Sequence, residues 1–181
     1  MPSLLKIILC ILLLAHGFAT AETIQAKVVR VADGDTITVL DQAKTQHKIR
    51  LSGIDAPENG MPFGQKSKQH LSDLVAGRVV TVETTKIDRY KRNVGKVLVD
   101  GQDANLAQVE AGFAWHYKAY QREQSPADRH AYGFAEERAR EAKKGLWLDR
   151  EPEPPWEWRK NRASNIQQLA KRRLPGIDQL H

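Results

Sequence analysis

The stretch Ile24-Gln25-Ala26-Lys27-Val28-Val29-Arg30-Val31 is followed by Ala32-Asp33-Gly34-Asp35 and then by Thr36-Ile37-Thr38-Val39-Leu40. Apolar side chains alternate with polar ones in the first and third segments, which predicts two half-buried strands. Asp33-Gly34 joins these segments, and both residue types favour turns. The sequence therefore predicts a β-hairpin that carries two aspartates at its turn.

Three more strands are predicted at residues 46–51, 79–82 and 94–99. One helix should end at Gly77, a second should run from Ala104 to Ala111, and a third should begin at Ser125-Pro126 with a capping pattern. The expected inner residues are Ser67, Leu71, Leu74 and Val75 in the first helix, and Ala131, Ala135, Ala139 and Ala142 in the third. Five strands with helices on one side are compatible with a small closed barrel, although periodicity alone leaves several topologies open.

Two further blocks combine charges of both signs: Arg50-Leu51-Ser52-Gly53-Ile54-Asp55-Ala56-Pro57-Glu58 and Asp88-Arg89-Tyr90-Lys91-Arg92. Clustered carboxylates are unfavourable unless a positive group shares the site. A divalent cation, Arg50 and the basic residues after Asp88 are the candidates for that group. A lone Asp-Gly-Asp would be only a turn, but together the three blocks indicate phosphodiester chemistry with a metal.

In order and spacing, these three blocks resemble the staphylococcal nuclease (thermonuclease) family, over about Ile24 to Trp147. The resemblance implies a mainly β fold with α (α+β): a five-stranded OB barrel with about three helices packed on it. Two positions depart from the family pattern. Ala56 stands where the best-known member has threonine, and Lys91 stands where glycine is usual.

The resemblance also assigns roles to individual residues. It makes Asp35 and Asp55 calcium ligands, with the backbone carbonyl of Ala56, and it makes Arg50, Glu58 and Arg92 the catalytic residues. Calcium prefers oxygen ligands, and neither motif contains histidine or cysteine. Asp33 is expected to support the ligands from outside. An EF-hand is excluded, because Thr38 and Lys44 stand where its loop needs the turn glycine and the terminal glutamate.

The chemistry of the catalytic side chains agrees with this assignment. Glu58 follows Pro57, whose fixed backbone helps to present the carboxylate as a general base. The planar guanidiniums of Arg50 and Arg92 can donate paired hydrogen bonds to phosphate oxygens. Aromatic rings that stack on bases suit unpaired strands. The predicted nucleic-acid contacts are Arg89, Tyr90, Tyr117 and Tyr120, whereas His116 is expected to be a partly exposed structural residue.

The first residues of this 181-residue chain are expected to form an export signal. Lys6 precedes an apolar run, and Ala19-Thr20-Ala21 is a cleavage pattern, so the mature chain should begin at Glu22. The run is too short for a spanning anchor, and the residues before Cys10 do not suit lipoprotein attachment. No cysteine would remain after cleavage, hence no disulfide framework.

We expect a nuclease-like domain at residues 22–149 and a Pro/Trp-rich strap with a basic tail at residues 150–181. Glu151-Pro152-Glu153-Pro154-Pro155 is interpreted as a stiff extended strap that Trp156 and Trp158 pin to the barrel. Beyond Arg159, a helix and disorder are both open. The run Lys171-Arg172-Arg173 is interpreted as a solvated tail.

The net charge of +6, or +5 without Lys6, favours anionic partners. The resulting hypothesis is a periplasmic or extracellular calcium-dependent nuclease that cuts DNA and RNA with little sequence specificity and favours single strands. The resemblance implies 3′-phosphate products. We expect a monomer without stable membrane insertion after signal cleavage. A non-catalytic OB module is the alternative, although its acids would repel phosphate without a cation. A metal-binding structural protein of the cell envelope would leave Arg50 and Arg92 unexplained.

Overall fold

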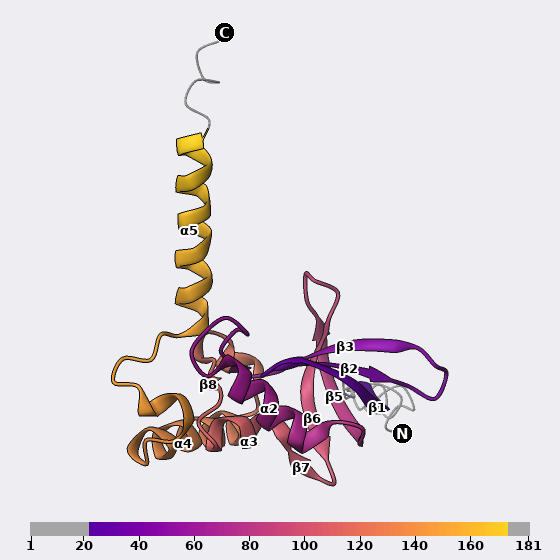
Figure 1. Ribbon diagram of the computed structural model, residues 1–181. Coiled ribbons are helices and arrows are strands. Elements are labelled where there is room, and N and C mark those ends of the chain that lie inside the picture. Colours follow the sequence, from indigo (N-terminus) through magenta and orange to yellow (C-terminus); the bar gives the residue numbers. More distant parts are fainter. Residues whose placement is uncertain (1–21, 174–181) are drawn as a thin grey trace, which may run out of the picture.

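The computed structural model describes residues 22–173, and the predicted hairpin forms its first part (Figure 1). Strand β1 (Glu22–Asp33) pairs antiparallel with β2 (Thr36–Leu40), and Val31 lies opposite Ile37. The export signal and its cleavage site at residues 1–21 lie outside the described residues. Within residues 22–173, no helix has the length and apolar character needed to cross a membrane.

The five-stranded barrel closes through a parallel pairing. Strand β3 (Gln46–Leu51) pairs antiparallel with β2, and β5 (Val79–Ile87) pairs antiparallel with both β1 and β6 (Asn93–Val99). Ile49 to Leu51 of β3 then pair in parallel with Asn93 to Gly95 of β6. The short strand β7 (Gln102–Asp103) extends the sheet beside β6. This closed mixed barrel confirms the expected OB-type α+β fold.

Helices cover one side of the barrel (Figure 1). Helix α2 (Gly64–Val75) buries Leu71 and Val75 completely against the barrel core, which stabilises the fold by about 1.5–3 kcal/mol for each side chain. Helix α3 (Ala104–Glu110) packs beside α2 and α4. The strand residues of the core whose exposed fraction is 0% are Ile37, Val39, Ile49, Val82 and Val97.

Helix α4 (Pro126–Glu141) begins as the sequence predicts. The Ser125 side chain accepts the backbone N–H of Asp128 at 3.0 Å, and Pro126 occupies the first turn. Its buried face contains Ala135 and Ala139 together with Tyr132 and Glu136. Ala142 is exposed, so its predicted place in the inner stripe is wrong: the helix ends at Glu141 before Ala142 can turn inward.

A helix replaces the end of the predicted strap, and beyond Arg159 the structure shows a helix as far as Arg173, which is one of the two alternatives left open. Residues after the short turn η3 (Gly145–Leu148) run without a helix until α5 (Pro155–Arg173), which points away from the barrel (Figure 1). Pro155 therefore begins a helix instead of continuing the strap, because proline suits a first helical turn. Trp156 anchors this helix: its ring lies 5.5 Å from Trp115 and 5.3 Å from Tyr117, centroid to centroid.

Candidate active site

The turn between β1 and β2 is held against the rest of the protein by close packing. A Cβ on Gly34 would lie 1.8 Å from Ser67 Oγ and 2.8 Å from the Ala56 Cβ, so only glycine fits there. Gln108, which is fully buried, donates from Nε2 to the Gly34 carbonyl at 2.6 Å. Asp35 follows immediately and is 6% exposed. Helix packing thus fixes where the Asp35 carboxylate lies.

A second, smaller sheet places Asp55. Strand β4 (Ile54–Asp55) pairs antiparallel with β8 (Trp115–His116), and Asp55 lies opposite Trp115. The Asp55 side chain is completely buried. A carboxylate in such a place needs charged or hydrogen-bonding partners to remain ionised.

Arg50, at the end of β3, joins the two acidic segments. Its Nη1 lies 2.6 Å from Asp35 Oδ2, and its Nη2 donates to Asp55 Oδ1 at 2.7 Å. Asp35 Oδ2 also accepts the backbone N–H of Ala56 at 2.7 Å. The structure therefore brings Asp35, Arg50, Asp55 and Ala56 together at one rim of the barrel.

Burial and charge act against each other in this cluster. Burial raises the pKa of Asp55 above its ordinary value, although Arg159 and Arg50 oppose the rise. Burial would lower the pKa of Arg50, but the charges of Asp35 and Asp55 outweigh it and raise that pKa. Burial and the Asp35 charge raise the pKa of Asp33 to about 6, and Asp33 Oδ1 accepts the Asp35 N–H at 3.1 Å. Asp33 thus supports Asp35 through the backbone N–H of that residue.

Glu58 lies at the edge of the cluster, and its side chain is 40% exposed. Its partner is Arg159 of α5, whose Nη1 donates to Glu58 Oε1 at 2.9 Å. Arg159 Nη2 donates to Asp55 Oδ2 at 2.7 Å, and Nη1 lies 3.3 Å from Asp55 Oδ1. No role at this site was predicted for Arg159 from the sequence. The only signal was its position next to the tryptophans expected to pin the extension to the barrel.

Arg92 is held away from these acids. Its Nε donates to Asp88 Oδ2 at 2.8 Å and its Nη2 lies 2.7 Å from the same oxygen. In the part of the chain that the structure describes, no hydrogen bond or ion pair joins Arg92 to Asp35, Asp55 or Glu58. Asp88 engages Nε and one N–H of Nη2, so the other guanidinium donors of Arg92 are left for the phosphate that the resemblance implies.

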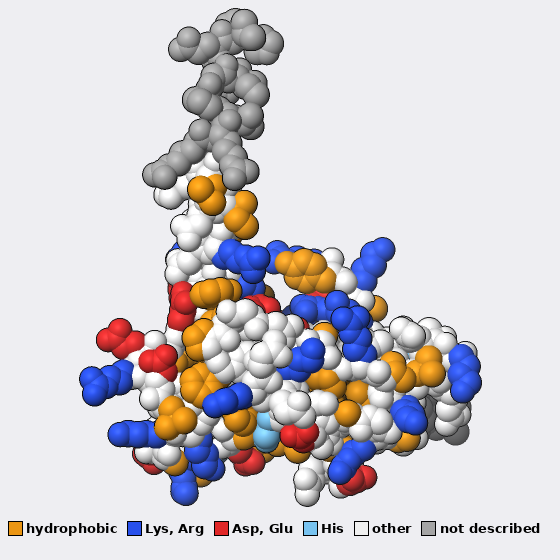
Figure 2. Space-filling view, viewed as in Figure 1, with side chains coloured by type: hydrophobic (Ala, Val, Ile, Leu, Met, Phe, Trp, Pro, Cys, Tyr) orange, Lys and Arg blue, Asp and Glu red, His pale blue; other side chains and the backbone are white. Residues whose placement is uncertain are grey.

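The loop that carries Arg92 presents an aromatic ring. Tyr90 is 63% exposed, and the guanidiniums of Arg89 and Arg92 lie 4.8 and 5.3 Å from its ring centroid. Lys91 has a φ of 59°, the left-handed conformation that favours glycine. Asp88 Oδ1 accepts the backbone N–H groups of Tyr90 and Arg92, which stabilises this turn. Figure 2 shows Lys and Arg side chains between this hairpin and the base of α5.

The two later tyrosines already have partners. The Tyr117 ring stacks on Trp156 with an interplanar angle of 9°. The Tyr120 ring packs edge-on against Tyr117, with 5.0 Å between the ring centroids. Tyr120 is 47% exposed, and the Lys86 ammonium lies 5.0 Å from its ring centroid. His116 is buried, not partly exposed as expected, because β8 packs against α4, where Glu136 Oε1 accepts the His116 backbone N–H at 3.1 Å. Its Nε2 is 2.8 Å from Gln124 Oε1, just before that helix.

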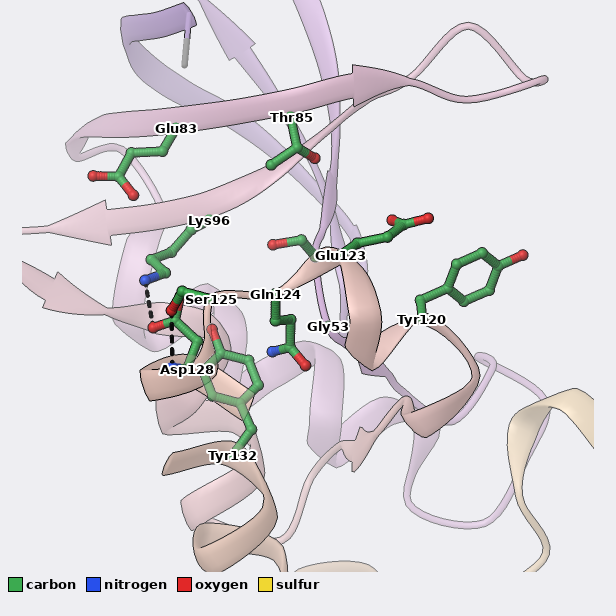
Figure 3. A pocket seen from close by; sticks show the side chains of 11 residues that line it. Gly53, Glu83, Thr85, Lys96, Tyr120, Glu123, Gln124, Ser125, Asp128 and Tyr132 are labelled. Carbon is green, nitrogen blue, oxygen red and sulfur yellow. Dashed lines mark hydrogen bonds and ion pairs between the residues drawn. The ribbon is translucent and has the colours of Figure 1, made fainter. Parts of the chain in front are cut away.

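A separate cavity of about 130 Å³ lies between the β5–β6 hairpin and the start of α4 (Figure 3). Lys96 crosses toward α4 and donates to Asp128 Oδ1 at 2.7 Å. Asp35, Arg50, Asp55 and Glu58 do not line it. The acidic cluster is thus distinct from this cavity.

The donor atoms of the cluster suit a hard cation. Within residues 22–173, no group of three or more His, Cys, Asp or Glu side chains forms a ready metal cage. Two carboxylates nevertheless converge beside a backbone segment, which is the oxygen-rich donor set that calcium prefers. The carboxylates of Asp35 and Asp55 therefore suit a hard cation whose remaining ligands are oxygens from outside this pair.

Comparison with known proteins shows which family this chain resembles. The family model described as staphylococcal nuclease homologue matches residues 48–149. An uncharacterized endonuclease of Haemophilus influenzae is 39% identical over 164 residues, which cover 89% of each chain. Micrococcal nuclease of Shigella flexneri is 38% identical over 145 residues, covering 75% of this chain and 80% of that protein. A 38.1 kDa protein of Capnoides sempervirens is 40% identical over 153 residues, but the matched part is 82% of this chain and 43% of that relative. The chain belongs to the staphylococcal nuclease family.

Proposed function

We propose that this protein is a nuclease that hydrolyses phosphodiester bonds of DNA and RNA with little sequence specificity. One observation carries the proposal: Arg50 holds two buried aspartates together, and the exposed carboxylate of Glu58 lies beside them. Relatives named endonuclease and micrococcal nuclease support the same chemistry. The acids would repel a bound phosphate unless a cation shared the site, which favours an enzyme over a passive strand-binding module.

The catalytic role that we propose for each side chain follows from its exposure to solvent and its chemistry. Glu58 faces solvent and accepts a proton from the attacking water, a contribution of roughly 10² to 10⁴ in rate. Arg50, 14% exposed, donates to phosphate oxygens as negative charge develops on them. Arg92 binds a second phosphate oxygen with the guanidinium donors that Asp88 does not occupy. The proton for the departing oxygen comes from water, because arginine is too weak an acid at neutral pH.

Nucleases of this family generally depend on a metal ion, and we propose calcium here. Asp35, Asp55 and the Ala56 carbonyl would hold it. When bound, it supplies positive charge that stabilises the phosphate oxygens of the transition state. Magnesium should substitute poorly, because it demands a tighter octahedral set of ligands than two turns and a backbone oxygen provide.

The surface near the acids suits single-stranded nucleic acid. Exposed Tyr90, flanked by Arg89, offers a face on which any base can stack. Arg89 and the nearby lysines neutralise backbone phosphates, so strand affinity should fall as salt rises. Tyr120 extends the contact, whereas Tyr117 contributes its edge, because Trp156 stacks on one face. We propose that the protein acts as a monomer and leaves 3′-phosphate ends.

Cleavage of labelled single- and double-stranded DNA and RNA by the mature protein tests this function. The expected result is cleavage of both nucleic acids in calcium, faster on single strands, little in magnesium, and none in excess chelator. Strand binding should be measured on the same samples. Binding without cleavage in calcium would instead support the strand-binding module, and full cleavage in chelator would overturn the metal mechanism.

We also propose that the protein is exported to the periplasm or the extracellular space. The support is the signal pattern ending at Ala21, whose small residues suit a signal peptidase. Mass spectrometry of protein recovered outside the cytoplasm should show Glu22 as the amino terminus. Recovered protein that retains residues 1–21 would contradict cleavage and favour an anchored form.

A further inference from the structure

Arg159 lies at the acidic cluster although it belongs to the C-terminal helix, outside the family match at residues 48–149. Its guanidinium binds both oxygens of Asp55 and Oε1 of Glu58, at distances from 2.7 to 3.3 Å. These residues are a proposed cation ligand and the proposed general base. The extension therefore contacts both of these carboxylates directly.

Arg159 and a cation would require the same oxygens. Asp55 Oδ1 already accepts from Arg50, and Arg159 binds Oδ2 and approaches Oδ1. A guanidinium has donors only, so it cannot act as a ligand beside a cation, and the two positive charges repel at such a distance. Direct binding of a cation to Asp55 therefore requires one guanidinium to move.

Arg159 is the guanidinium that can move. Its side chain is 43% exposed, compared with 14% for Arg50, which bridges Asp35 and Asp55 inside the barrel rim. The helix itself can stay in place, because Trp156 remains packed on Trp115 and Tyr117 while a long side chain three positions later turns toward solvent. Displacement thus involves only side-chain rotation.

We propose that Arg159 is a positioning residue of this site: an internal counter-ion that holds Asp55 and Glu58 together and that the cation displaces. Arg159 thereby sets the calcium concentration that the enzyme needs. The inference rests on the proposed function only for the position of the cation at Asp35 and Asp55. It predicts that the extension weakens cation binding in the absence of any substrate.

Calcium binding to the mature protein, measured by calorimetry without nucleic acid, tests the inference. Because the competing charge is removed, Arg159→Gln should bind calcium about tenfold or more tightly than the parent. Arg159→Lys keeps one charge but cannot bridge two carboxylates, so its affinity should lie between the two. Arg162→Gln removes an exposed charge from the same helix and should keep the parental affinity.

Thermal unfolding gives a second readout. Calcium should raise the melting temperature of Arg159→Gln more than that of the parent, because a tighter ligand stabilises the folded state more. If Arg159→Gln does not fold, Arg159→Lys decides, since it too must bind calcium more tightly than the parent. Equal affinities in parent and Arg159 variants, or no calcium binding in any of them, would overturn the inference. Tighter binding by a variant in a protein that cleaves no nucleic acid would leave the inference standing while the proposed function fails.

Discussion

Asp35 Oδ2 accepts a hydrogen bond from the backbone N–H of Ala56 at 2.7 Å, across 21 positions of sequence. The hairpin turn and the segment after β4 are therefore joined before any cation binds. This bond presents the Asp35 carboxylate and the Ala56 backbone side by side. Since groups that are already ordered lose little freedom on binding, the cation that we propose for this rim would meet a carboxylate that is already held in place.

Replacement of Asp35 by alanine should raise the calcium concentration needed for half-maximal cleavage. The variant loses one carboxylate ligand and the hydrogen bond to Ala56, but Asp55 and the Ala56 carbonyl remain. Excess calcium should therefore recover part of the rate. A calcium titration of cleavage measures this effect, with Asp73→Ala on the exposed face of α2 as the control. A parental calcium requirement in Asp35→Ala would remove Asp35 from the cation site.

Glu58→Gln should reduce turnover by roughly 10² or more while strand affinity stays nearly parental. Glutamine keeps the size of the side chain and can still accept from Arg159, but it cannot take a proton from water. Single-turnover cleavage and strand binding measure the two quantities separately. Glu137→Gln, at an exposed position of α4, is the matched control. If Glu58→Gln cleaves at the parental rate, water activation belongs to another group such as Asp33.

Arg50→Lys should lower both turnover and stability. A lysine carries one ammonium group and cannot bridge Asp35 and Asp55 as the planar guanidinium does. We expect the free energy of unfolding to fall by about 1–3 kcal/mol, because one buried carboxylate loses a charged partner. Turnover should fall more than strand affinity. Urea unfolding and cleavage kinetics on the same preparation check both effects, and unchanged stability would show that the ion pairs contribute nothing.

Asp88→Asn should destabilise the protein more near neutral pH than in acid. Burial would raise the pKa of Asp88, but hydrogen bonds from the Arg92 backbone and side chain outweigh this effect and lower that pKa. A lowered folded-state pKa means that the charge stabilises the fold above the unfolded-state pKa of about 4 and stops doing so as pH falls through the folded value. The expected loss is about 1–2 kcal/mol at pH 7, shrinking toward pH 3. Urea unfolding at pH 7 and pH 3 measures this loss of stability. An equal loss at both pH values would show that the effect comes from side-chain packing and not from the charge.

Some features of this protein could be predicted because they depend on residues close in sequence. Alternation in residues 24–40 predicts the β1–β2 hairpin, and Ser125-Pro126 predicts the start of α4. Asp35, Arg50 and Asp55 could be expected to meet because turn residues and family spacing place them at strand ends. Local propensity and a recognisable motif were sufficient for these features.

Other features were decided by tertiary packing. The parallel β3–β6 pairing that closes the barrel has no signature in either strand. Arg159 reaches Glu58 across 101 positions of sequence, because Trp156 packs on Trp115 and Tyr117 and so directs the next turn of α5 to the acids. The amino-acid sequence by itself determined the hairpin, the acidic motifs and the family. Which arginine side chains pair with the buried acids was decided only when distant segments packed together, since a buried charge without a partner is too costly.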